Sequence, residues 1–134
     1  RNVVFEEGPK DPRAHYRRAS IFMMTSAYEG FSMVLLESLQ MGVVPIAFDS
    51  FASLHDVIED GHNGLIVPDS DLEAYAERLA GLMRDRDRRE KMAGNAVESC
   101  RRFSRDTIAG QWLDLFETVA SEPDRASPRG SFPS

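Results

Sequence analysis

Two carboxylates eight residues apart stand in a stretch of sequence that is otherwise uncharged. Glu29 and Glu37 enclose residues 30–36, which carry no other charge. A carboxylate among apolar side chains is costly unless a hydrogen bond compensates it. On a continuous helix, with a rise of about 1.5 Å per residue, the two carboxylates would lie roughly 12 Å apart along the axis. This separation suits an elongated ligand with a polar group at each end and an anion in the middle.

The elements that must position these acids are a strand, a loop and a helix. The apolar run Ile21–Met24 predicts a buried parallel strand, and residues 31–41 predict a helix that is apolar on nearly every face. Free backbone N–H groups and the helix dipole make such a helix start a binding site for an anion. A nucleotide-diphosphate sugar combines this anion with two polar ends. The amides that we expect to bind it belong to Gly30, Phe31, Ser32, Met33 and Val34.

The residues around the two acids add a wider pattern. Gly30-Phe31 follows the first acid, and Ser38-x3-Gly42-Val-x-Pro45 follows the second. Together with Glu29-x7-Glu37, this pattern resembles the signature of the family-4, or group 1, retaining glycosyltransferases. The resemblance implies an enzyme with two Rossmann-like domains in the GT-B arrangement. The signature belongs to the later part of the C-terminal, donor-binding domain.

The resemblance also implies a role for each acid. Glu29 would be the catalytic-site acid that hydrogen-bonds hydroxyls of the donor sugar near the reacting carbon, and Glu37 would accept the ribose hydroxyls. The amides of residues 30–34 would stabilise the diphosphate as it leaves. The family generally works without a metal, so we expect no metal and no cofactor besides the nucleotide-sugar substrate. The activity implied is sugar transfer to a glycan or a lipid-linked acceptor, in polysaccharide biosynthesis.

Simpler interpretations of the same residues exist. Glu29 could be a first-turn acid favoured by the helix dipole, and Glu37 a solvated position on the helix. We expect the side chains of Phe31 and Met33 to lie in the core. Ser32 stands where the family often has glycine, and its Cβ narrows the approach to the phosphates. Residues 49–56 replace the frequent Gly-Gly-x-Pro-Glu pattern, which indicates a subgroup with different donor or acceptor contacts.

Composition narrows the class of protein. The chain has 134 residues, 42% of them hydrophobic, and a net charge of −6, which argues against a nucleic-acid partner. Apolar runs fall far short of the ~20 residues needed to span a bilayer. We also expect no contact with a membrane surface, because the arginines of residues 84–91 alternate with acids. Cys100 is the single cysteine, which fits a cytoplasmic location. The three histidines have no metal-like spacing.

The remaining pattern predicts an α/β fold, a Rossmann-like doubly wound parallel sheet of about four strands followed by C-terminal helices. The expected strands are residues 3–5, 21–24, 44–48 and 65–67, and a turn covers residues 60–64. The expected helices are residues 12–19, 31–41, 53–59, 86–103 and 107–120. A further helix is expected to begin at a cap formed by residues 69–71. In the last helix we expect an inward-facing stripe of Ile108, Trp112, Leu115 and Phe116.

The domain prediction follows from the resemblance. Residues 1–120 correspond to a partial nucleotide-sugar-binding domain, and residues 121–134 to a disordered tail rich in Pro, Ser and Gly. We interpret the chain as a piece of a longer polypeptide that lacks two βα units and the N-terminal acceptor domain. An open sheet edge would result, repaired by rearrangement, by homodimerisation or by swapping. We therefore expect weak donor binding and no useful turnover from this chain alone.

Two other functions stay open from the sequence. A non-catalytic nucleotide- or phosphate-binding module, such as a receiver-like regulatory domain, would use an Asp at the end of a strand, and Asp49 holds such a position. A fragment of a nucleotide-sugar epimerase would share the fold and use both acids differently.

Overall fold

The computed structural model describes residues 3–6, 8 and 11–121 of the chain. The chain divides into two compact units, Arg1–Arg101 and Arg102–Ser134. The first unit holds the sheet and the candidate site, and the second holds the long C-terminal helix. Within the described ranges, every helix is too short or too polar to span a membrane.

A parallel sheet forms the centre of the first unit. Its strands are β1 (Ile21–Met24), β2 (Val44–Phe48) and β3 (Leu65–Val67), in the order β1-β2-β3. Every residue of β2 is buried, as expected for the middle strand of a parallel sheet that is covered on both faces. These three strands have the predicted boundaries, and the parallel α/β architecture is confirmed.

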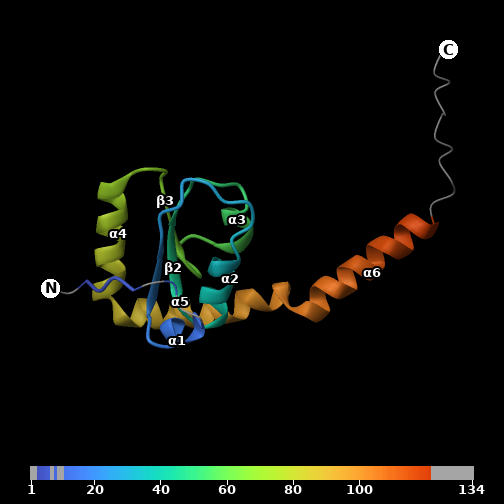
Figure 1. The fold of residues 1–134 in the computed structure, drawn as a ribbon, viewed down its shortest axis with the longest axis horizontal. Helices are drawn as coiled ribbons and strands as arrows, with labels where there is room; N and C mark the ends of the chain where they lie inside the picture. Colours follow the sequence, from blue (N-terminus) through green and yellow to red (C-terminus); the bar gives the residue numbers. More distant parts are fainter. Residues whose placement is uncertain (1–2, 7, 9–10, 122–134) are drawn as a thin grey trace, which may run out of the picture. The chain divides into compact units, whose positions relative to one another are not determined.

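Helices cover the sheet on both sides. Figure 1 places α4 (Leu72–Arg84) on one side, and α2 (Met33–Gln40) and α3 (Leu54–Val57) on the other. The short α1 (Arg13–Tyr16) precedes β1, and α5 (Arg86–Ser99) runs into the 3-10 turn η1 (Cys100–Phe103). The second unit contains α6 (Arg105–Ser121). Both α1 and α2 are shorter than the sequence predicted.

The helix ends follow local chemistry. The Asp71 carboxylate accepts a hydrogen bond from the Ala74 amide at the start of α4, and the Asp85 carboxylate accepts one from the Arg88 amide at the start of α5. After α2 the chain turns at Gly42, whose φ of 67° is the left-handed conformation that favours glycine at a helix C-terminus. The turn before β3 likewise contains Gly61 with positive φ.

The core lies between the sheet and helices α4 and α5. The Phe48 and Tyr75 rings are 4.8 Å apart, and the Tyr75 hydroxyl donates to the carbonyl of Ile46 at 2.9 Å. This bond satisfies a buried hydroxyl inside an apolar cluster. The cluster consists of Val44, Ile46, Phe48, Leu65, Val67, Tyr75, Leu82 and Met92.

The predicted strand at residues 3–5 is wrong. Val3, Val4 and Phe5 have no strand conformation, and Phe5 is 96% exposed. An apolar run forms a strand only where a neighbouring strand pairs with it, and none of the described residues does so here. The described sheet therefore has three strands rather than about four, and β1 is an edge strand.

The predicted inward stripe on the last helix is also wrong. No residue of α6 is buried, and Trp112 is 54% exposed. The spacing places apolar side chains on one face, where the Trp112 and Phe116 rings lie 5.6 Å apart. The spacing of apolar residues does not determine whether another element packs on them, and no described element of the second unit buries this face. Residues 122–134 of the predicted tail lie outside the described residues.

Candidate functional site

The loops that follow β1 and β2 meet at the carboxyl ends of these strands. The Ser50 hydroxyl donates to the carbonyl of Ser26 at 2.7 Å, and the Ser53 hydroxyl donates to the carbonyl of Gly30 at 2.5 Å. Both bonds tie the segment before α2 to the segment after β2. In open parallel sheets, ligands bind at this end of the strands.

The start of α2 has no cap from its own sequence. Ser32 is the N-cap residue, with φ −82° and ψ 97°, and its side chain makes no capping hydrogen bond. The buried hydroxyl instead lies 3.6 Å from the sulfur of Met24, to which it donates. No acid lies in the first turn. The first amides of the helix therefore lack both an intrahelical acceptor and a capping side chain, which is the condition for binding an anion.

Glu29 lies before the helix and is half-buried. Because α2 begins at Met33, Glu29 is outside the first helical turn, where the dipole-stabilised alternative would place it. The helical rise applies only from Met33 to Glu37, roughly 6 Å of axial length. The estimate of roughly 12 Å between the two acids was therefore wrong in its premise, since residues 29–32 are not helical.

Glu37 lies inside α2, is half-buried and has a hydrogen-bond partner. The Tyr16 hydroxyl donates to Glu37 Oε2 at 3.4 Å and to the carbonyl of Val34 at 3.3 Å. Burial raises the pKa of Tyr16, and the charge of Glu37 and the hydrogen bond to it raise this pKa further. Nothing in the sequence spacing of Tyr16 indicates this partner 21 residues later.

Apolar side chains beside the helix start face outward. Phe31, Met33 and Val34 are all exposed, with Met33 at 60%. The expectation that Phe31 and Met33 lie in the core is wrong: Phe31 precedes α2, and Met33 lies outside the buried face of that helix. That buried face consists of Leu35, Leu36, Ser38 and Leu39.

Asp49 and His55 form an exposed pair next to this region. The His55 Nε2 and Asp49 Oδ1 atoms are 2.7 Å apart. Asp49 follows β2 directly, and the pair lies in the segment 49–56 that departs from the glycosyltransferase pattern. Within the described residues, no group of three or more His, Cys, Asp or Glu side chains is arranged to hold a metal ion.

Comparison with known proteins places the chain in a family. The model of the family described as glycosyl transferases group 1 matches residues 2–99. The chain belongs to the group 1 glycosyltransferase family. The match covers the whole sheet and both acids, and it ends with α5.

Two curated relatives illustrate the range of this glycosyltransferase family. An exopolysaccharide phosphotransferase from Streptomyces coelicolor is 36% identical over 81% of this chain and 12% of its own length. From Campylobacter jejuni, a GalNAc-α-(1→4)-GalNAc-α-(1→3)-diNAcBac-PP-undecaprenol α-1,4-N-acetyl-D-galactosaminyltransferase is 33% identical over 80% of this chain and 30% of its own length. The chain thus spans less than a third of either relative.

Solved structures of similar fold include the pneumococcal O-GlcNAc transferase GtfA in complex with UDP and GlcNAc. The likeness has a TM-score of 0.72 at 26% identity and covers 87% of this chain and 24% of that one. TarM gives a TM-score of 0.74 at 24% identity, over 81% of this chain and 22% of that one, which supports the Rossmann-like fold.

Proposed function

We propose that this chain is the donor-binding part of a family-4 type retaining glycosyltransferase. The complete enzyme would move a sugar from a nucleotide-diphosphate sugar to a glycan or a lipid-linked acceptor. One observation carries the proposal: Glu29 and Glu37 flank the uncapped start of α2 at the ligand-binding end of a parallel sheet. Membership of the group 1 glycosyltransferase family supports it.

The proposed chemistry follows from the charges around this helix start. As the bond between the donor sugar and the diphosphate breaks, negative charge grows on the leaving diphosphate. The amides of residues 30–34 stabilise that charge with preorganised N–H donors and the helix dipole. Glu29 accepts hydrogen bonds from hydroxyls of the sugar, and Glu37 accepts them from the ribose. The acceptor attacks from the same face of the sugar that the diphosphate leaves.

Two similar proteins support this assignment of substrates. The pneumococcal GtfA structure holds UDP and GlcNAc, and the Campylobacter relative is described as acting on an undecaprenol-linked glycan. A nucleotide-sugar donor and a glycan or lipid-linked acceptor are the corresponding substrate classes for this chain. The Streptomyces relative gives less support for the substrate classes, because the chain spans only 12% of its length.

We assign residues 1–120 to a partial donor domain and residues 121–134 to a tail. Acceptor binding then falls to a domain outside this sequence, and the enzyme works in the cytoplasm. Turnover by the 134-residue chain alone is expected to be negligible, because one substrate lacks its binding surface.

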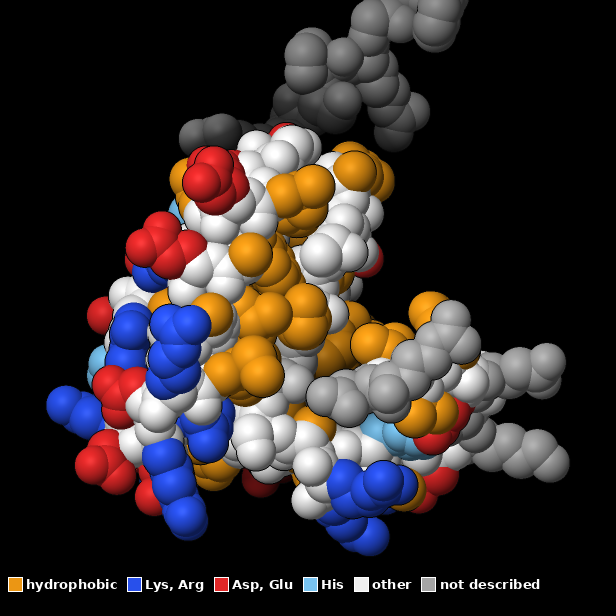
Figure 2. Space-filling model, turned by 90° about the vertical axis from the view of Figure 1, so that its left-hand side faces the viewer, with side chains coloured by type: hydrophobic (Ala, Val, Ile, Leu, Met, Phe, Trp, Pro, Cys, Tyr) orange, Lys and Arg blue, Asp and Glu red, His pale blue; other side chains and the backbone are white. Residues whose placement is uncertain are grey.

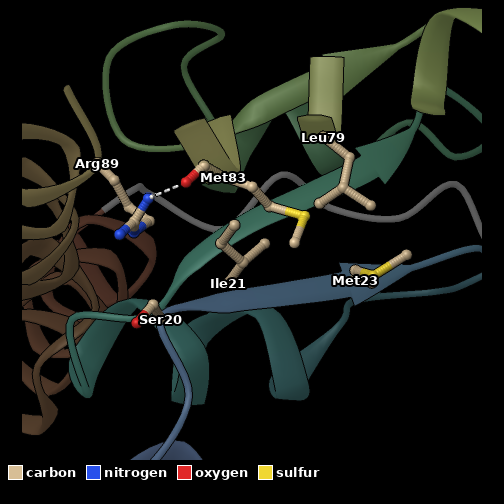
Figure 3. Close-up of a pocket in the computed structure, with 6 residues that line it drawn as sticks. All are labelled: Ser20, Ile21, Met23, Leu79, Met83 and Arg89. Atoms are coloured by element: carbon tan, nitrogen blue, oxygen red, sulfur yellow. Dashed lines mark hydrogen bonds between the residues drawn. The ribbon is translucent and has the colours of Figure 1, made fainter. Parts of the chain in front are cut away.

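We further assign homodimerisation to the open edge of the sheet. Among the described residues, β1 pairs on one side only, and Met23 is 53% exposed. Figure 2 shows apolar side chains gathered on this face of the molecule. A groove of about 330 Å³ lies there, and Figure 3 shows Ile21 and Met23 of β1 lining it together with Leu79 and Met83 of α4. An unpaired edge beside an apolar groove favours strand pairing with a second copy.

The test of donor binding is an NMR titration of the isotope-labelled chain with UDP, GDP and ADP. We expect the amide resonances of residues 30–34 to shift with at least one nucleotide, and the shifts to disappear in Glu37→Ala. Glu98→Ala is the matched control, since Glu98 is exposed on α5 and pairs with Arg101. Shifts that persist in Glu37→Ala, or that avoid residues 30–34, would contradict the proposal.

The receiver-like module is a second candidate because Asp49 ends a strand. Its carboxylate is already paired with His55, and the family match favours the transferase. Magnesium-dependent labelling of Asp49 by acetyl phosphate would favour the receiver instead.

A further inference from the structure

Tyr16 connects three elements that lie far apart in the sequence. It is the only buried residue of α1, at the C-terminal end of that helix. Its ring lies 6.0 Å from the ring of Phe22 in β1, with an interplanar angle of 57°, a favourable tilted arrangement. Its hydroxyl reaches α2, where it contacts the carbonyl of Val34 and the carboxylate of Glu37.

The two acceptors of this hydroxyl lie on one face of α2. Val34 and Glu37 are three residues apart and therefore neighbours on the helix surface. The two oxygen–oxygen distances, 3.3 and 3.4 Å, are longer than the usual ~2.7 Å of such bonds, as expected when one proton is shared between two acceptors. The hydroxyl therefore contacts both groups at once and lies against one oxygen of the carboxylate.

Among the described residues, Glu37 has no partner comparable to Tyr16. Within the described part of the chain its carboxylate forms no ion pair, and Tyr16 donates the single hydrogen bond that it accepts. That bond goes to Oε2, so Oε1 is left to accept a bond from a ligand. A glutamate loses considerable rotamer freedom when it is fixed, and a restraint made before binding lowers this cost.

We propose that Tyr16 is a positioning residue that holds the Glu37 carboxylate in the orientation needed to accept the ribose hydroxyls. This inference rests on the proposed donor-binding function and adds a residue from outside the acid pattern. The tyrosine ring packs against Phe22 of the sheet, which fixes the position of the hydroxyl. The hydroxyl in turn limits the orientations of the Glu37 carboxylate through its hydrogen bond.

The variant that isolates the hydroxyl is Tyr16→Phe, because the ring that packs on Phe22 is kept. We expect the dissociation constant of the bound nucleoside diphosphate, taken from UDP, GDP and ADP, to rise roughly 3- to 10-fold. For the 2′,3′-dideoxy form of the same nucleotide we expect no change, because the hydroxyls that Glu37 accepts are absent.

Tyr75→Phe is the matched control. It also removes a buried tyrosine hydroxyl, but that hydroxyl donates to the carbonyl of Ile46 and not to Glu37. We expect this variant to bind the nucleotide and its dideoxy form as the unchanged chain does. A general loss of stability would affect both variants, whereas loss of positioning affects Tyr16→Phe alone.

A second readout needs no ligand. Three-bond NMR couplings of the Glu37 side chain should indicate one dominant rotamer in the unchanged chain and in Tyr75→Phe, and averaging in Tyr16→Phe. Unchanged couplings in Tyr16→Phe, or equal losses for the ribose and dideoxy nucleotides, would overturn the positioning role. Failure of the unchanged chain to bind any of the three nucleotides would instead overturn the proposed function.

Discussion

The two acids of the candidate site are held in different ways. Glu29 lies in a loop whose backbone is tied to the neighbouring segment through Gly30, whereas Glu37 is built into α2 and restrained by Tyr16. A residue in a loop can adjust its position as the substrate changes during the reaction, whereas a residue in a helix keeps its position. This difference agrees with the proposal that Glu29 binds the donor sugar and Glu37 binds the ribose.

The first prediction separates these roles with isosteric variants. Glu37→Gln should weaken the binding of both a nucleoside diphosphate and its sugar conjugate roughly tenfold, since a carboxylate acceptor is replaced by an amide. Glu29→Gln should weaken only the binding of the sugar conjugate. Titrations of both ligands against both variants check this, and a Glu29→Gln variant that weakens the free diphosphate equally would contradict the assignment.

The second prediction concerns Gly64, just before β3. A Cβ there would lie 2.9 Å from both Ile58 Cγ2 and Pro45 Cγ, and 3.0 Å from the Pro45 carbonyl oxygen. The carbonyl belongs to a buried strand and has little room to move, so Gly64→Ala should destabilise the fold by about 1–3 kcal/mol. Gly94→Ala is the control, because α5 leaves space at Gly94. Urea unfolding should find that variant more stable by about 0.5–1 kcal/mol.

Among the elements, α4 and α5 share a single junction residue. Asp85 ends α4 and caps α5, with its carboxylate accepting from the Arg88 amide at 2.9 Å. The third prediction is that Asp85→Ala lowers the free energy of unfolding by about 1 kcal/mol. Asp87→Ala, in the exposed first turn of α5, should cost less, because that carboxylate acts only through the helix dipole. Equal losses in urea unfolding would contradict the capping role.

The elements also indicate what the sequence could predict. The strands β1, β2 and β3 and the caps Gly42 and Asp71 follow from local chemistry: apolar runs, turn residues and side chains that bond nearby amides. Residues 3–5 and the apolar face of α6 were misassigned because burial depends on a covering surface that periodicity does not reveal. The Tyr16–Glu37 contact was missed for a related reason, since it forms only when α1 and α2 meet in three dimensions.

At the scale of the whole molecule, stability should depend on pH in the alkaline range. Burial raises the pKa of Tyr16, with further increases from Glu37, and burial also raises the pKa of Tyr75. Each ring therefore contributes stability that is complete below pH ~10, the unfolded pKa, and is lost as pH rises through the folded pKa. The fourth prediction is that the urea midpoint falls between pH 9 and 11, and falls less in Tyr16→Phe. An equal fall in both proteins would contradict it.

The final prediction concerns association through the edge of the sheet. In a parallel sheet the edge strand presents unpaired amides and carbonyls, and beside β1 these groups adjoin an apolar groove that Met23 helps to line. Met23→Lys places a charge where a second strand would pair, so it should shift the chain toward monomer. Leu72→Lys is the control, because Leu72 is also apolar and exposed, at the start of α4, but does not line the groove.

Sedimentation across a range of protein concentrations distinguishes the two variants. The unchanged chain and Leu72→Lys should show a concentration-dependent dimer, and Met23→Lys should sediment mainly as a monomer at the same concentrations. Charge alone cannot produce this difference, because both variants gain one lysine. A monomeric unchanged chain at every concentration would mean that the β1 edge is not a site of self-association, and the donor-binding proposal would be unaffected.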